Sequence, residues 1–386
     1  MPKDLDVNIR VMKKIIYFDN NATTPADSRV VEAMLPYFTS NFINPSSNYS
    51  LGYSSKKIID SSRMIISSNI GAQQNEIIFT SGATEAINLA IKGIAETNSD
   101  KGRHIITTQT EHSAVLNVCK YLEKKGFEID YLPVDNDGLI DINEFEDKIR
   151  KDTILVSVIY VNNETGVIQP IKAIGEICKN KKLIFFTDAT QAVGKIQIDV
   201  NDLNIDLMCF SGHKFYGPKG IGGLFRKKNV QLLPLIHGGG QEQGLRGGTL
   251  NVPGIVGLAK AFELSMNEIQ IYEIKVKTLR DEFESKLLTT NKIKLNGHLT
   301  KRLYNVSNIS LIGIDPELLQ KELFDVAYSK GSACNSSSIK PSHVLKAMGL
   351  SDDEALASFR FSFSKFNTLE EINTVTKSLL KILGVS

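Results

Sequence analysis

Lys214 is the residue whose surroundings in this chain most clearly suggest chemistry. It ends the run Ser211-Gly-His-Lys214, which follows directly on the apolar stretch 206–210, so we expect it at the end of a buried strand. Burial and neighbouring cations lower the pKa of a lysine, and a neutral amine can form a Schiff base with an aldehyde cofactor. A lysine after a strand can also be an ordinary surface residue, so the interpretation depends on the residues that accompany it.

A carboxylate stands at the end of a second predicted strand. Residues 182–188 form a short apolar run that ends in Asp188, and ligands of parallel α/β sheets gather at the carboxyl ends of strands. Pyridoxal phosphate needs such an acid, because a carboxylate against its pyridine nitrogen keeps the ring protonated and electron-withdrawing. Gln191 follows within reach of the ring hydroxyl oxygen. The alternative is that Asp188 caps a following helix.

A phosphate site is predicted where the strand-like run 76–80 turns into a helical stretch. The turn 81–84 consists of small residues, and a helix that starts there offers free backbone N–H groups and the positive end of its dipole. Thr84 can add its hydroxyl, and Ser211 and His213 can reach the same phosphate. The pattern Ser-Gly-x-Thr is also a plain N-capping sequence.

Two further predicted strand ends carry polar residues. His112 follows the run 104–108 and opens a helix, where its ring could stack on the pyridine face and shuttle protons near neutral pH. A histidine in that position can equally be a cap or a surface residue. Asn163 follows the run 154–161 at the same edge and could bond the cofactor or a substrate carboxylate.

Cys334 is the candidate nucleophile. It lies in a small, polar stretch ahead of a predicted helix at 341–348, which indicates an exposed and mobile loop. The other cysteines fall in amphipathic helical patterns (Cys119 and Cys178) or in a buried strand (Cys209), and we expect them to be structural. No pair has the spacing of a metal site or of a disulfide framework, so no resident metal is expected.

The elements that must position these residues follow a clear order. Short apolar strands alternate with amphipathic helices from residue 76 to 226, which predicts an α/β fold with a mostly parallel sheet covered on both faces. A long helical segment at 252–288 leads to a smaller α+β part, with strands at 305–311 and 358–364 and helices near Pro316, Ser342 and Thr368.

These patterns predict two domains with the site in the cleft between them. We place the large, cofactor-binding domain at residues 14–260 and the small domain at 1–13 and 261–386, with the cysteine loop at about 327–341.

Composition agrees with an enzyme of the cytoplasm. The chain has 386 residues, of which 42% are hydrophobic and 23% charged, and its net charge of +2 provides no basis for nucleic-acid or membrane binding. Four cysteines without paired spacing fit a reducing compartment. No apolar run approaches the ~18 residues that a membrane span needs.

Ten motifs occur in one order along nearly the whole chain, from about Ile16 to the last helix. They are residues 19–24, 44–47, 80–85, 111–112, 162–164, 188–191, 211–214, 246–249, 331–334 and 360–362. Their order and spacing resemble the NifS/IscS-type cysteine desulfurases, which are class V, fold-type I pyridoxal-phosphate enzymes. One departure is Tyr49, where many relatives carry a histidine, and this would alter the entrance to the pocket.

The resemblance implies a fold-type I transferase fold and a role for each candidate residue. Lys214 would hold pyridoxal phosphate covalently, and Arg360 would hold the substrate carboxylate, which suits its planar fork. Thr249 would reach the phosphate of the other subunit's cofactor, so the enzyme would be a homodimer. The remaining cofactor contacts would be Ala83, Thr84, His112, Asn163, Asp188, Gln191, Ser211 and His213.

The implied reaction removes sulfur from L-cysteine, gives L-alanine and leaves a persulfide on Cys334. Lys214 or His112 would move the α-proton. An acceptor protein, such as an iron–sulfur scaffold, would then take the sulfur, and Cys334 could act as a transient iron–sulfur ligand.

Two alternatives stay open, and so does the identity of the acceptor. One is another reaction on this scaffold, carried out by a selenocysteine lyase, a cysteine sulfinate desulfinase or an aminotransferase. The other is a catalytically idle sulfur-carrier subunit.

Overall fold

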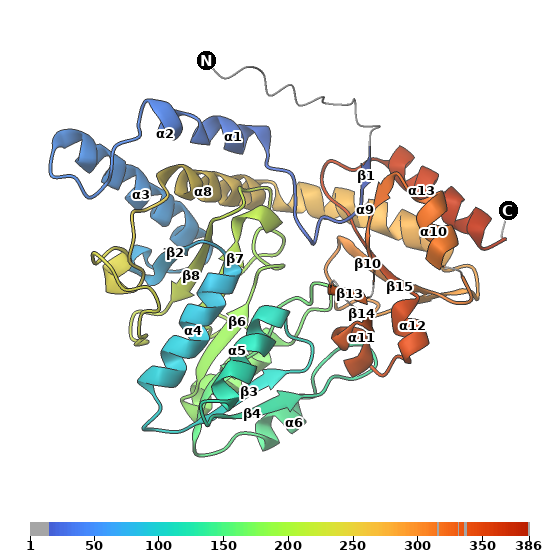
Figure 1. The fold of residues 1–386 in the computed structure, drawn as a ribbon, viewed down its shortest axis with the longest axis horizontal. Helices are drawn as coiled ribbons and strands as arrows, with labels where there is room; N and C mark the ends of the chain where they lie inside the picture. Colours follow the sequence, from blue (N-terminus) through green and yellow to red (C-terminus); the bar gives the residue numbers. More distant parts are fainter. Residues whose placement is uncertain (1–14, 315, 331, 336–337, 385–386) are drawn as a thin grey trace.

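The computed structural model describes residues 15–314, 316–330, 332–335 and 338–384 (Figure 1). Its centre is a seven-stranded sheet with helices on both faces, and a four-stranded antiparallel sheet lies beside it. Within the described ranges no helix is both long enough and apolar enough to cross a membrane.

The large sheet is mostly parallel, as predicted. Its strands lie in the order β2-β8-β7-β6-β5-β3-β4, and β8 alone runs antiparallel to its two neighbours. The strands are β2 (Ile77–Thr80), β3 (His104–Thr108), β4 (Glu128–Leu132), β5 (Thr153–Ser157), β6 (Ile184–Asp188), β7 (Leu207–Ser211) and β8 (Gly222–Arg226). Because β2, β3, β5, β6 and β7 point the same way, the residues that follow them meet at one edge.

Burial on both faces explains why these strands are continuous apolar runs. All five residues of β7 are buried. Leu207 and Cys209 pack into the apolar cluster of one face, and Met208 and Phe210 into that of the other. An apolar residue is therefore needed at every position rather than at every second one.

Helices connect the strands and cover both faces. The helices α4 (Ala83–Thr97) and α5 (Ser113–Glu123) cover one face, and α3 (Ser50–Asn69), α7 (Ile171–Lys181) and α8 (Val252–Asn267) pack against the other. The shorter helices are α1 (Ser28–Met34), α2 (Pro36–Thr39) and α6 (Ile142–Asp147).

The long helical segment predicted at 252–288 is two helices. Glu268, with φ −107° and ψ 4°, separates α8 from α9 (Ile269–Leu287). The helical extent was predicted well, but the break was not, because the amphipathic pattern continues across it.

The small sheet has the order β12-β15-β10-β9 and packs against α9 and α13 (Leu369–Ile382). Its strands are β9 (Ile293–Leu295), β10 (Val306–Leu311), β12 (Ser329–Lys330) and β15 (Ser358–Ser362), and nearby helices are α10 (Pro316–Glu322), α11 (His343–Ala347) and α12 (Asp352–Leu356). The chain's first described strand, β1 (Ile16–Tyr17), pairs in parallel with β11 (Val326–Ala327). Residues 1–13 lie outside the described residues, and the domain boundaries stay a proposal.

One predicted strand is shorter than expected. The run 154–161 was predicted as a single strand, but β5 ends at Ser157. Beyond it the N–H groups of Val158 and Tyr160 still donate to carbonyl oxygens of the β6 segment, at 3.1 and 3.0 Å. The chain thus stays against the sheet as it approaches Asn163.

Candidate active site

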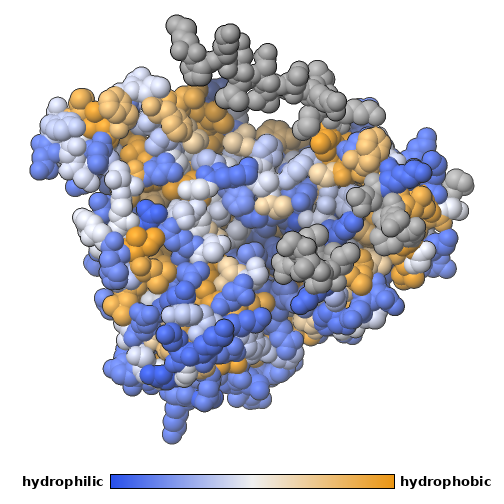
Figure 2. Space-filling model, in the orientation of Figure 1, coloured by the Kyte–Doolittle hydropathy of each residue, from blue (hydrophilic) through white to orange (hydrophobic). Residues whose placement is uncertain are grey.

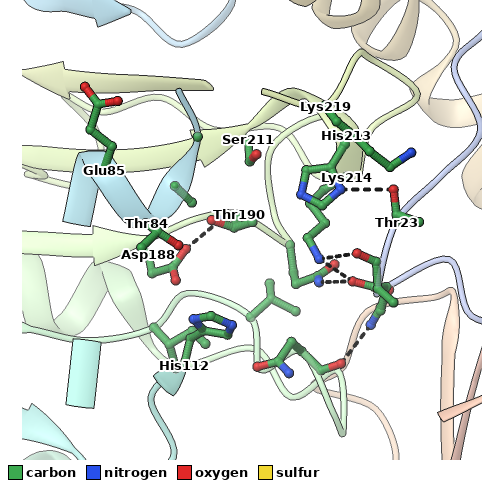
Figure 3. A pocket seen from close by; sticks show the side chains of 18 of the residues that line it. Thr23, Thr84, Glu85, His112, Asp188, Thr190, Ser211, His213, Lys214 and Lys219 are labelled. Atoms are coloured by element: carbon green, nitrogen blue, oxygen red, sulfur yellow. Dashed lines mark hydrogen bonds between the residues drawn. The ribbon is translucent and has the colours of Figure 1, made fainter. Parts of the chain in front are cut away.

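A cavity of about 700 Å³ lies at the carboxyl edge of the large sheet (Figure 3). Its walls come from the segments that follow β2, β3, β5, β6 and β7, from the loop before α1, and from β15. It brings together ten of the residues that the sequence analysis singled out: Ala83, Thr84, His112, Asn163, Asp188, Gln191, Ser211, His213, Lys214 and Arg360. Their roles stay predictions.

Lys214 lies on the single 3₁₀ turn η2 (Gly212–Lys214) that follows β7. Its half-buried amine donates to the carbonyl oxygens of Asn21 and Ala22, each at 2.7 Å. Burial lowers the pKa of Lys214 to about 8, and the charge of Arg360 contributes to the shift. At neutral pH the amine is therefore neutral in a far larger fraction of molecules than that of an exposed lysine.

Asp188 ends β6 and is 4% exposed. Its Oδ1 accepts hydrogen bonds from the backbone N–H of Thr190 at 2.9 Å and from the thiol of Cys209 at 3.4 Å. No ion pair among the described residues includes it. A buried carboxylate without a cationic partner is costly, so its setting fits a protonated ring nitrogen in the cavity. The capping alternative is wrong, because residues 189–195 form turns and no helix.

The start of α4 can receive an anion. Gly82 precedes the helix with φ 152°, a conformation that favours glycine, and no side chain caps the first turn. The N-capping alternative for Ser-Gly-x-Thr is therefore wrong. Gly82, Ala83 and Thr84 line the cavity together with Ser211. Uncapped N–H groups at a helix start, with hydroxyls beside them, are suited to a phosphate.

Glu85 connects the start of α4 to the loop that contains Arg246. Its carboxylate accepts from the N–H of Ser81 at 2.8 Å and from Nε of Arg246 at 2.9 Å. Arg246 begins the motif that ends in Thr249. Thr249 is exposed and does not line the cavity of its own chain, so its predicted contact with a second subunit's cofactor stays a prediction.

His112 lines the cavity and also caps α5. Its Nδ1 accepts a hydrogen bond from the N–H of Ala114 at 3.2 Å, which confirms that His112 caps the helix. The ring still lines the cavity. Burial by surrounding protein lowers the pKa of His112, and Lys214 adds to the lowering. A largely neutral imidazole can take up a proton.

The residue before it is a second buried carboxyl group, which the sequence analysis did not single out. Glu111 is fully buried, and its Oε1 accepts from the N–H of Ile159 at 2.6 Å, while Oε2 has no partner among the described residues. Burial raises the pKa of Glu111 well above its ordinary value, and Asp188 contributes. The protonated form of Glu111 is therefore favoured beside the site.

Arg360 reaches the cavity from the small sheet. It lies on β15 between the buried Phe359 and Phe361. Its guanidinium donates to the carbonyl oxygen of Asn163 at 2.9 Å, to Oδ1 of Asp19 at 2.6 Å and to Oγ of Ser329 at 2.7 Å. Its Nε has no partner among the described residues. A planar fork held in this way can present donors to a carboxylate.

The loop 19–24 is one of the ten motifs, but none of its residues was predicted as part of the site. Asn21, Ala22 and Thr23 line the cavity, and Thr23 lies 3.0 Å from Nδ1 of His213. Asn21 holds Lys214 through its backbone carbonyl, which any residue type would provide. Only its place among the ten motifs could have indicated the loop.

The cysteine segment is a hairpin rather than the predicted loop. The backbone of β13 (Ser332–Asn335) pairs antiparallel with β14 (Ser338–Pro341), with Cys334 opposite Ile339. The small, polar residues of this segment have no strand periodicity, which explains the wrong prediction. The side chain of Cys334 lies outside the described residues.

Both ends of the hairpin are attached to the rim of the cavity. Before it, Ser329 contacts Arg360 and donates to Asp19 at 2.9 Å. After it, Ser342 donates to the carboxylate of Glu164 at 2.5 Å, and Nε2 of His343 lies 2.9 Å from the carbonyl oxygen of Glu111. The hairpin therefore begins and ends beside the predicted substrate and cofactor residues.

The three other cysteines are buried, as predicted. Burial raises the pKa of Cys119 to about 12 and raises those of Cys178 and Cys209 as well, so these thiols stay protonated. Among the described side chains, no group of three or more His, Cys, Asp or Glu residues could hold a metal ion.

Known proteins resemble this chain over almost its whole length. Residues 16–375 match the family described as aminotransferase class-V. A cysteine desulfurase IscS of Methanosarcina thermophila is 50% identical over 378 residues, which cover 97% of this chain and 94% of that protein.

Two solved structures have the same fold. One, described as a NifS-like protein, has a TM-score of 0.90 at 39% identity and covers 96% of this chain and 100% of its own. Another, described as SspA in complex with cysteine, has a TM-score of 0.82 at 40% identity, with 92% and 100% covered.

The chain belongs to the class-V aminotransferase family, within its cysteine desulfurase branch. Enzymes of this family depend in general on pyridoxal phosphate. The groups described above fit that cofactor, since the cavity combines a lysine of lowered pKa, an unpaired buried carboxylate and an uncapped helix start.

Proposed function

We propose that this chain removes the sulfur of L-cysteine to give L-alanine, with pyridoxal phosphate held in the cavity and Cys334 as the sulfur acceptor. The observation that carries the proposal is the placement of Lys214. Its amine, with a pKa of about 8, lies in a cavity that also contains Arg360 and Asp188, a carboxylate with no ion pair among the described residues. Bound pyridoxal phosphate would supply electron withdrawal from the substrate's α-carbon.

The residues divide the binding of the cofactor among them. Lys214 would hold it covalently, and Asp188 would keep its ring nitrogen protonated. The α4 start, with Thr84, Ser211 and His213, would take the phosphate. His112 would lie against the ring, and Gln191 and Asn163 would contact its polar groups.

The chain's own groups would then act in sequence. Arg360 would orient the substrate carboxylate, and Lys214 or His112 would take the α-proton. The Cys334 thiolate would attack the substrate sulfur, so that an S–S bond forms while the Cβ–S bond breaks. The electron pair of the broken bond stays on Cβ, and protonation there yields the methyl group of alanine. The balance is one cysteine and one thiol in, one alanine and one persulfide out.

We further propose that two copies form the active enzyme. Exposed apolar side chains gather over α1, α2 and α3, where Figure 2 shows a hydrophobic region at one end of the molecule. They include Leu35, Phe38, Phe42, Leu51 and Tyr53. A surface of this kind suits a partner. The Thr249 loop would then reach the second cavity, and an acceptor protein, such as an iron–sulfur scaffold, would take the persulfide sulfur.

The test uses purified protein with pyridoxal phosphate, L-cysteine and a reductant, and it quantifies alanine and sulfide together. Equimolar products are expected from the wild type and from Ser332→Ala, which changes the same strand without removing the thiol. Cys334→Ala should lose both products while it keeps the cofactor's visible absorbance. Alanine release that survives in Cys334→Ala would favour a lyase or a desulfinase. A wild type that stays colourless would favour the idle carrier.

A further inference from the structure

Lys195 is a buried lysine to which the proposed reaction assigns no role. It is 6% exposed, and no ion pair among the described residues includes it. Lysines are almost never this buried without an anionic partner. Burial lowers the pKa of Lys195 to about 7, and the charges of Lys214 and Arg360 contribute.

The contacts of Lys195 lead toward the cavity. Its Nζ donates to Oε1 of Gln191 at 2.7 Å, and Nε2 of Gln191 donates to the carbonyl oxygen of Asn21 at 2.9 Å. The carbonyl oxygen of Asn21 can only accept, so it faces the amide nitrogen of Gln191 and leaves the amide oxygen toward Lys195. The same Asn21 oxygen also accepts from Lys214.

This orientation leaves one N–H group of the Gln191 amide without an assigned acceptor among the described residues. An amide nitrogen carries two hydrogens, and Asn21 takes one of them. Gln191 is 3% exposed and lines the cavity, so its second N–H is available to a molecule bound there.

No carboxylate among the described residues pairs with Lys195. Lys195 also lines a void of only about 10 Å³, together with groups such as Tyr216 and Tyr304, which has room for one water at most. The charged groups that act on Lys195 are the cations Lys214 and Arg360. An anion bound in the cavity would therefore supply the negative charge that the described residues do not place beside Lys195.

We propose that Lys195 is a positioning residue for the cofactor, which orients and polarises the Gln191 amide so that it donates a hydrogen bond to the ring oxygen of pyridoxal phosphate. The inference depends on the cofactor assigned under the proposed function. A donor to the amide oxygen makes the amide N–H a stronger donor, and a charged donor does so most. The ring oxygen is thereby favoured in its anionic form.

The test is a pH titration of the visible absorbance of the bound cofactor. Lys195→Met and Gln191→Met should each raise the midpoint by about one pH unit, because loss of a donor to an anion favours its protonated form. The double variant should shift the midpoint no further than either single variant, because Lys195 acts through Gln191. Independent, additive shifts would overturn the proposal, as would an unchanged midpoint in Lys195→Met.

A matched control separates this role from a general effect of losing a buried lysine. Lys365 is also 6% exposed but pairs with Asp27 at 2.6 Å, so Lys365→Met should lower thermal stability and leave the midpoint unchanged. A shift in Lys365→Met as large as that in Lys195→Met would overturn the proposal.

A second variant covers the case in which Lys195→Met does not fold. Lys195→Arg keeps the donors and should stay within about 0.3 unit of the wild type. A shift as large as that of Gln191→Met would count against the inference. A coloured wild type without alanine production would refute the proposed function alone, whereas a wild type that binds no cofactor would refute both.

Discussion

The two sheets contribute to the cavity in different ways. The large sheet presents its groups from strand ends, where each is placed by a turn of a few residues. The small sheet presents Arg360 from within β15 and holds it through Asn163 and Asp19, which lie 197 and 341 residues away in the chain. The proposed cofactor site is thus built locally, and the proposed substrate site depends on how the two sheets meet.

Because the two sites are built differently, substitutions in the two sheets should cause different defects. A change within the large sheet's turns should affect cofactor binding and every later step. A change in the contacts of Arg360 should affect the KM for cysteine and leave the cofactor's absorbance as it is.

The largest effect is expected at the large-sheet edge. Lys214→Ala should lower alanine production by about 10³-fold or more, because it removes both the covalent attachment and a candidate base. The measurement is alanine released per enzyme with saturating cysteine. Lys179→Ala, an exposed lysine on α7, should match the wild type. Turnover retained by Lys214→Ala would contradict the assignment.

The next effect belongs to the small sheet. Arg360→Lys should raise the KM for cysteine by about 10- to 100-fold, because an ammonium cannot reproduce the planar fork. The absorbance of the bound cofactor should not change. Steady-state kinetics and a spectrum of the same preparation provide both readings. Loss of cofactor in this variant would break the separation between the two sheets.

A smaller change is expected from the partner of Arg360. Asp19→Asn keeps the size of the side chain but removes the charge of an ion pair at 2.6 Å, so the KM should rise by about threefold to tenfold. Asp202→Asn, from an exposed pair with Lys172, is the control and should have no measurable effect. An unchanged KM in Asp19→Asn would show that the arginine is held well enough by its neutral contacts.

The smallest effect on turnover is expected at Glu111, whose substitution reports on stability instead. Its pKa lies well above the ordinary 4.5, so the folded state binds the extra proton and loses stability as pH rises above 4.5. Glu111→Gln mimics the protonated form. The variant should match the wild type in thermal unfolding near pH 4.5 and exceed it at pH 8. A variant that is less stable than the wild type at pH 8 would contradict the assignment.

Sequence reasoning predicted best what short segments determine. Asp188, His112 and Lys214 each follow an apolar run, and parallel strands bring such positions to one edge. The large sheet could be read in the same way, because double-sided burial demands uninterrupted apolar residues.

Sequence reasoning failed where a contact depends on distant segments or on backbone atoms. The contact of Asp19 with Arg360 joins opposite ends of the chain, and no local pattern announces it. Asn21 acts through its carbonyl group, which is present in every residue. Glu268 breaks a helix whose amphipathic pattern continues, and the hairpin around Cys334 has no apolar alternation because its residues are small and polar.

The attachment of the cysteine hairpin at both ends limits how far sulfur can travel. Ser329 and Ser342 are fixed to the rim by hydrogen bonds, and thirteen residue steps separate them. Even fully extended, such a tether spans only about 45 Å, so its midpoint can stand at most about 20 Å from the rim. As long as both attachments persist, the proposed persulfide on Cys334 cannot reach an acceptor that lies farther away. The proposed acceptor must bring its sulfur-accepting group within that radius.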